Sequence, residues 1–272
     1  MLKKLIKHDM RSISKSAVPM FIVSGIVSIV CCAMLYFTYG FSEDVNSVFT
    51  AVIVTSGFYL LGMVAIMVLG VVTAFISISK YYKSLFTDEG YLTMVLPVKT
   101  VTLFSAKLLS TFIWIAFAML VTGACAIVAL YLPTVLYNPD LIGEAVVDIK
   151  WMLGFGQPIS GIARAALILK LIGNVFSFIS TVFIIITAVT LGSVILRKQR
   201  VIGCILFYFV INLLAEGVIG LAAVLSGAIY GENYAEAADL TVAVFSIILH
   251  ILISCAMYFI NLHILDKKFN IE

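Results

Sequence analysis

Long runs of apolar residues, separated by short polar stretches, dominate the hydrophobic pattern of this chain. A helix needs about 20 apolar residues to cross roughly 30 Å of hydrocarbon, and several runs reach that length. They predict spans at residues 18–39, 48–79, 108–132, 171–196, 201–229 and 240–262. The runs are continuously apolar rather than alternating. This favours helices over a barrel, because a helix satisfies its own backbone hydrogen bonds in lipid.

The predicted fold is therefore an all-α integral membrane protein, with six transmembrane helices in a single domain over residues 1–272. The second run has about 32 residues, which would span about 48 Å as a helix. We expect this helix to protrude from the membrane or to tilt strongly.

The first residues show an amphipathic pattern instead. At about 100° per residue, the apolar side chains of residues 2–15 share one arc, and the basic ones lie opposite. The apolar arc holds Leu2, Leu5, Ile6, Met10 and Ile13; the basic arc holds Lys3, Lys4, Lys7, Arg11 and Lys15. This predicts an interfacial helix with its lysines on anionic lipid headgroups. Asp9 interrupts the apolar arc, so a protein partner for that arc is the second interpretation.

The polar stretch between the second and third spans predicts a short helix. Thr87 or Asp88 can cap it, and acidic residues suit its N-terminal end. Pro97 stops or kinks it. Such a helix either docks in a groove of a cytoplasmic protein or merely reconnects two spans, and the pattern leaves both interpretations open.

Composition strengthens the membrane interpretation, because hydrophobic residues make up 63% of the chain and charged residues only 11%. Fourteen of the seventeen basic residues lie on one side of the spans: Lys3, Lys4, Lys7, Arg11, Lys15, Lys80, Lys83, Lys99, Lys107, Arg197, Lys198, Arg200, Lys267 and Lys268. The other side has Lys150, Arg164 and Lys170. Basic loops stay in the cytoplasm, which predicts that both termini are cytoplasmic. The net charge of +3 thus gives no indication of nucleic-acid binding.

Motifs for catalysis are missing from the sequence. It contains no G-x-x-x-x-G-K-[ST] loop for ATP, no H-E-x-x-H zinc motif and no G-x-S-x-G elbow. We therefore expect no catalytic residue, no metal site and no cofactor in this chain, and no enzyme activity of its own.

A few polar residues lie inside the predicted spans. Tyr208, Asn212 and Glu216 are spaced by four and share one helix face, and Asn174, Ser177 and Thr181 form a similar stripe on the fourth span. An acid within a span is a functional candidate, so one interpretation is a polar lining on a translocation path. The other is hydrogen bonding between helices, for example of Glu216 with Arg164 or Lys170.

The loop after the second span carries a family resemblance. Its sequence Y-K-S-L-F-T-D-E-G-Y-L-T-M-V-L-P-V-K-T, at residues 82–100, resembles the cytoplasmic loop of small six-span permease subunits of ABC-2 type transporters in Gram-positive bacteria. Residues 1–9 and 265–272 are also similar to the ends of those subunits. Within the group, the chain looks most like the membrane subunit of exporters for amphipathic peptide toxins of the phenol-soluble modulin type.

The resemblance implies a full transporter of two membrane subunits and two separate cytoplasmic ABC ATPase subunits, which bind ATP and Mg²⁺. It also implies a coupling helix that contacts the ATPase. The residues concerned are Thr87, Asp88, Glu89, Gly90, Tyr91, Leu92, Leu96 and Pro97.

From these observations we expect the transmembrane subunit of an ATP-driven exporter in a bacterial cell membrane, in contact with lipid. It would move amphipathic peptides or other partly apolar substrates. Twofold pairing of two permease subunits, most simply as a homodimer, would supply two docking surfaces for two ATPases. An ion-coupled secondary carrier and a non-transporting membrane scaffold or sensor are the alternatives.

Overall fold

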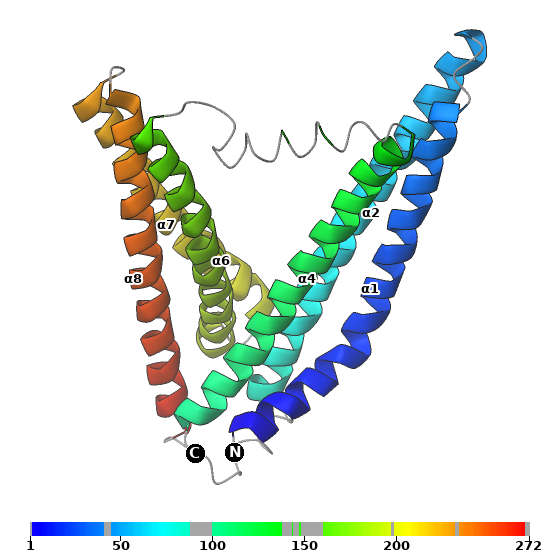
Figure 1. Ribbon diagram of the computed structural model, residues 1–272. Coiled ribbons are helices and arrows are strands. Elements are labelled where there is room, and N and C mark those ends of the chain that lie inside the picture. The colour runs from blue at the N-terminus through cyan, green and yellow to red at the C-terminus, as the bar shows by residue number, and fades with distance from the viewer. Residues whose placement is uncertain are drawn as a thin grey trace. The chain divides into compact units, whose positions relative to one another are not determined.

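Six long helices make up the computed structural model, which describes residues 2–40, 45–87, 100–137, 143, 147, 160–196, 199–231 and 234–269. They are α1 (Leu2–Gly40), α2 (Val45–Phe86), α4 (Thr100–Tyr137), α6 (Gly161–Ile195), α7 (Arg200–Tyr230) and α8 (Ala235–Phe269) (Figure 1). Within those residues there is no strand. The predicted all-helical class is confirmed.

All six helices are long and apolar enough to cross a membrane, by length and composition. Many of their large apolar side chains are exposed on the chain itself, such as Leu213 at 76% and Ile229 at 78%. Monomeric proteins in water rarely expose so much contiguous apolar surface. These helices are those of a multi-pass membrane protein.

The helices extend beyond the apolar runs that predicted them. α2 has 42 residues, about 63 Å at 1.5 Å per residue, or roughly twice the hydrocarbon thickness. α6 begins at Gly161, ten residues before the predicted span, because Ser160 caps it by accepting a hydrogen bond from the backbone N–H of Ala163 at 3.1 Å. Hydropathy locates the apolar part of a helix, whereas capping locates its end.

The chain divides into two compact units, residues 1–146 and 147–272. Each is described by itself, and the expected single domain stays a prediction. In unit 1, α1, α2 and α4 all contact one another. α1 and α4 run parallel, since Asp9 meets Lys107 near their first turns and Ser28 donates to the carbonyl of Cys125 further along. Parallel first and third helices are what three successive crossings require.

The amphipathic segment 2–15 is the first part of α1 and not a helix of its own. α1 bends in its first half (Figure 1), and Pro19 lies inside the helix, where it removes one backbone hydrogen bond. Two residues of the predicted apolar arc pack onto α4: Ile13 is buried with Ala17 and Trp114, and Met10 packs against them. The four lysines and the arginine of the opposite arc are exposed.

In unit 2, α6, α7 and α8 likewise contact one another. α6 and α8 run parallel, because Lys170 pairs with Asp239 and, further along both helices, Asn261 meets Thr187. α6 has the largest buried share of the three. Gly192 brings α6 and α7 close together, since a Cβ at this residue would lie 2.5 Å from the backbone nitrogen of Cys204.

Candidate functional site

The six residues of the predicted translocation path all lie in unit 2. On α6, Asn174 is exposed, and Ser177 and Thr181 are half-buried. On α7, Tyr208 and Asn212 are half-buried and Glu216 is exposed. In the described ranges no hydrogen bond or ion pair joins the α6 stripe to the α7 stripe. Each stripe keeps its predicted helix face, but no polar interaction links the two in the described residues.

Glu216 lies among apolar side chains. Leu213 and Leu214 on the preceding turn are 76% and 64% exposed, and Leu221 further on is 65% exposed. His250, a second ionisable residue within the predicted spans, lies on α8. His250 is only 6% exposed, and its Nδ1 has no hydrogen-bond partner within the described part of the chain.

The alternative pairing of Glu216 with Lys170 is not what the structure has. Lys170 Nζ lies 2.8 Å from Asp239 Oδ2. Nearer the start of both helices, Ser160 donates a hydrogen bond to Glu236. These two contacts join the N-terminal parts of α6 and α8.

A buried polar contact between α6 and α8 was not predicted. Asn261 and Thr187 are both 0% exposed, and Asn261 Nδ2 donates to Thr187 Oγ1 at 2.7 Å. The spacing of His250, Ser254 and Asn261 along the last span is a signal that was available in the sequence. It places all three near one helix face.

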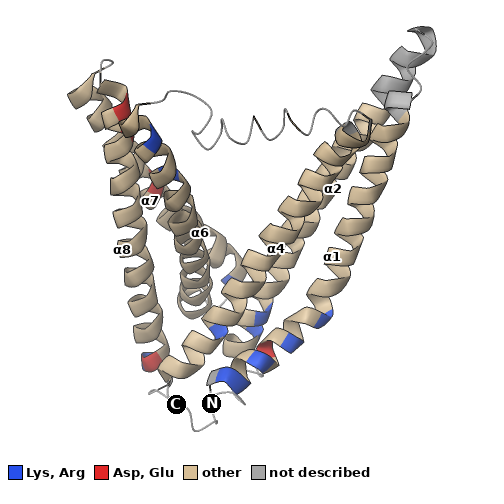
Figure 2. Cartoon of the chain, in the orientation of Figure 1, with Lys and Arg blue, Asp and Glu red and all other residues tan. Residues whose placement is uncertain are grey.

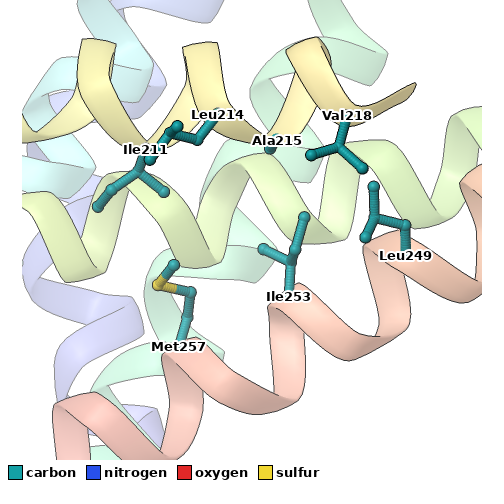
Figure 3. A pocket seen from close by; sticks show the side chains of 7 residues that line it. All are labelled: Ile211, Leu214, Ala215, Val218, Leu249, Ile253 and Met257. Carbon is teal, nitrogen blue, oxygen red and sulfur yellow. The ribbon is translucent and has the colours of Figure 1, made fainter. Parts of the chain in front are cut away.

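An apolar hollow of about 280 Å³ lies between α7 and α8. Its lining is Ile211, Leu214, Ala215, Val218, Leu249, Ile253 and Met257 (Figure 3). Figure 3 shows side chains from the two helices turned toward each other across it. Neither Glu216 nor His250 belongs to this lining.

Basic residues of unit 1 gather at one end, where α1 and α4 begin and α2 ends (Figure 2). Lys107 of this group is buried rather than free in a loop: its side chain is 8% exposed, and its Nζ lies 2.6 Å from Asp9 Oδ1. The acid that interrupts the predicted apolar arc thus pairs within the chain.

Most of the predicted coupling segment lies outside the described residues. This holds for Asp88, Glu89, Gly90, Tyr91, Leu92, Leu96 and Pro97. Thr87 is described, and its hydroxyl donates to the carbonyl of Lys83 in the last turn of α2. The ATPase contacts stay a prediction.

Among the described residues, no group of three or more His, Cys, Asp or Glu side chains could hold a metal ion. Comparison with known proteins finds no family model, no curated protein and no solved structure that matches this chain. A function must therefore be argued from the residues themselves.

Proposed function

We propose that this chain is the membrane subunit of an ATP-driven exporter whose ATPase subunits are separate chains. The observation that carries the proposal is the sequence D-E-G-Y-L…L-P at residues 88–97, which is similar to the coupling loop of ABC-2 type permeases. Six helices of span length, in a chain without a P-loop, fit a permease that depends on a partner for ATP hydrolysis.

The helices that flank this segment fit a mechanical role. α2 continues to Phe86 and α4 begins at Thr100, both beyond the predicted apolar spans. Tyr81 and Leu85, in the last turns of α2, are 2% and 1% exposed, so these turns are packed. ATP-driven closure of two ATPases would pull on residues 87–97 and move both helices between inward and outward states.

The proposed place of the protein is a bacterial cell membrane with both termini in the cytoplasm. The basic end of unit 1 supports this orientation (Figure 2), because basic segments are retained on the cytoplasmic side. The exposed lysines at the start of α1 would lie on anionic headgroups at the inner leaflet. A second permease subunit, most simply another copy of this chain, would supply the docking surface for the second ATPase subunit.

The proposed cargo is an amphipathic peptide or another partly apolar molecule. The hollow between α7 and α8 supports this class, since its lining is apolar. Binding sites for partly apolar molecules are lined mainly by apolar side chains.

An ion-coupled carrier is the second candidate function. The observation that favours it is that two apolar helices each carry an ionisable residue, Glu216 on α7 and the buried His250 on α8. Transport that follows an ion gradient without nucleotide would select it over the exporter.

The decisive experiment uses the chain reconstituted with an ATPase encoded beside it. We expect the chain alone to hydrolyse no ATP and the complex to hydrolyse it with stimulation by amphipathic peptides. Tyr91→Glu with Leu92→Glu should abolish coupling or assembly while membrane insertion persists. Tyr234→Glu, a charge placed at an exposed residue before α8, should have no effect. Normal coupling in the double variant, or ATP hydrolysis by the chain alone, would refute the proposal.

A further inference from the structure

The hollow between α7 and α8 lies at a depth where a bilayer holds hydrocarbon. Its lining runs from Ile211 to Val218 on α7 and from Leu249 to Met257 on α8 (Figure 3). Both segments include the middle of their candidate membrane spans. Seven residues of helix rise about 10 Å, so the lining covers about a third of the roughly 30 Å of hydrocarbon.

The chemistry of the lining favours an occupant that is entirely apolar. The described residues that line the hollow are leucine, isoleucine, valine, alanine and methionine. Water is absent from the bilayer core, and an empty hollow would deprive the lining of the dispersion contacts that a packed interior has. A pocket for a drug-sized ligand usually adds a few polar groups that fix its orientation, and this lining supplies none.

Size and access narrow the occupant to a slender chain. The volume of about 280 Å³ is below the roughly 300–1,000 Å³ of pockets for drug-sized ligands. A peptide helix is about 10–12 Å across, and a length of about 10 Å has roughly three times this volume, so a peptide would place only side chains there. Leu214 and Val218 in the lining are 64% and 44% exposed. The hollow therefore opens sideways, and a chain from the surrounding lipid can enter it without passing a polar side chain of the lining.

We propose that this hollow binds one acyl chain of a membrane phospholipid. The headgroup stays at the membrane surface, and the end of the acyl chain reaches the middle of the bilayer, where the hollow lies. Dispersion contacts between the acyl chain and the lining hold it, and no covalent bond forms or breaks. Binding requires neither ATP nor cargo, so the site goes beyond export. In the proposed exporter, an apolar part of the cargo would have to displace the acyl chain, and that step alone rests on the proposed function.

The test is photo-crosslinking of the full chain in nanodiscs of phosphatidylglycerol, a small fraction of which carries a diazirine at the end of one acyl chain. Irradiation attaches the probe to the side chains that it touches, and mass spectrometry of peptides locates them. We expect labelling of Ile253 and Met257, which are half-buried in the lining. Leu252, which is 61% exposed and outside the lining, should also be labelled, by bulk lipid. A diazirine next to the headgroup should label none of these residues.

A filled hollow separates the bound acyl chain from bulk lipid. Val218→Trp should lower the labelling of Ile253 and Met257 by about tenfold, as a loss of about 1.4 kcal/mol in the binding of the acyl chain would. Labelling of Leu252 should persist. Val224→Trp is the matched control, because Val224 on α7 is 70% exposed and outside the lining, and it should leave all three residues labelled as in the wild type.

A second pair of variants repeats the comparison with a smaller side chain. Ala215 belongs to the lining, whereas Ala223 is exposed on α7 outside it, so Ala215→Leu should lower the labelling of Ile253 and Met257 and Ala223→Leu should not. Labelling of Leu252 alone in the wild type would overturn the proposal, since lipid would then touch only the outer surface. Equal labelling of Ile253 and Met257 within both pairs of variants would overturn it too. No ATPase is present, so this result and the exporter test fail or succeed separately.

Discussion

At the scale of single residues, two ion pairs of the chain lie in contrasting environments. The side chains of Lys107 and Asp9, which join α4 to α1, are 8% and 13% exposed. Those of Lys170 and Asp239, which join α6 to α8, are 49% and 60% exposed. An exposed pair is solvated with or without its partner, whereas a buried charge that loses its partner is left uncompensated.

Lys107→Met should therefore destabilise the protein much more than Lys170→Met does. We expect a loss of about 3 kcal/mol in the free energy of unfolding for the buried pair. For the exposed pair we expect a loss of about 0.5 kcal/mol. Chemical unfolding in detergent micelles measures both variants under the same conditions.

A double variant separates the buried charge from the lost contact. Asp9→Leu with Lys107→Met removes both charges and should recover most of the stability lost in Lys107→Met, since apolar replacements of a buried pair are often neutral. Equal losses for Lys107→Met and Lys170→Met would show that burial does not distinguish the two pairs.

At the scale of helices, glycine sets how closely α6 and α7 approach. A Cβ at Gly192 would lie 2.5 Å from the backbone nitrogen and 2.9 Å from the Cα of Cys204. Backbone atoms cannot move aside as a flexible side chain can, so the two helices would have to separate. At Gly217 on α7, by contrast, no atom lies within 4 Å of the added Cβ.

Gly192→Ala should destabilise the protein by about 1–3 kcal/mol, the range of overpacking in a well-packed contact. Gly217→Ala should instead stabilise it by up to about 1 kcal/mol, because alanine is the better helix former. The same unfolding assay compares the two. A Gly192→Ala variant as stable as Gly217→Ala would mean that the close approach of α6 and α7 is not required.

Sequence predicted the helices far better than their contacts. Apolar run length found all six helices, but it missed the first ten residues of α6, which depend on the Ser160 cap. The polar stripe on α7 led to Glu216. Periodicity within one helix carries no information about which faces meet, so the contact of Asn261 on α8 with Thr187 on α6 was not predicted. Asp9 looked anomalous in its arc because Lys107, 98 residues away, is its partner.

If cargo binds in the hollow between α7 and α8, filling the hollow should weaken the response of the ATPase to cargo. Leu249→Trp adds a large side chain to the apolar lining and should reduce ATPase stimulation by amphipathic peptides in the reconstituted complex. Leu252→Trp places the same group on the same helix at a residue that is 61% exposed, and it should leave stimulation unchanged. The basal ATPase rate of both variants should match that of the wild type.

Equal stimulation of the Leu249→Trp and Leu252→Trp complexes would remove the hollow from the path of the cargo. Loss of basal ATPase activity in Leu249→Trp alone would instead point to damage of the permease. Stimulation by small hydrophilic solutes only would contradict the amphipathic cargo class itself.

At the scale of the whole molecule, orientation follows from charge and from the number of crossings. The basic residues at the start of α1 and the end of α8 are predicted to lie in the cytoplasm. Between Lys7 and the exposed Tyr234 the chain passes through α1, α2, α4, α6 and α7. An odd number of crossings puts these two residues on opposite sides, and a further crossing by α8 brings Lys267 back to the side of Lys7.

Cysteine labelling of intact cells checks this arrangement. The five native cysteines, at positions 31, 32, 125, 204 and 255, are first replaced by alanine. A membrane-impermeant maleimide should then label Tyr234→Cys directly, and should label Lys7→Cys and Lys267→Cys only after the membrane is permeabilised. Labelling of Lys7→Cys and Lys267→Cys from outside, with Tyr234→Cys protected, would reverse the orientation. Opposite behaviour of Lys7→Cys and Lys267→Cys would mean that one of the six helices does not cross. Because the parity of crossings is fixed by the chain, this result does not depend on the cargo or on the ATPase.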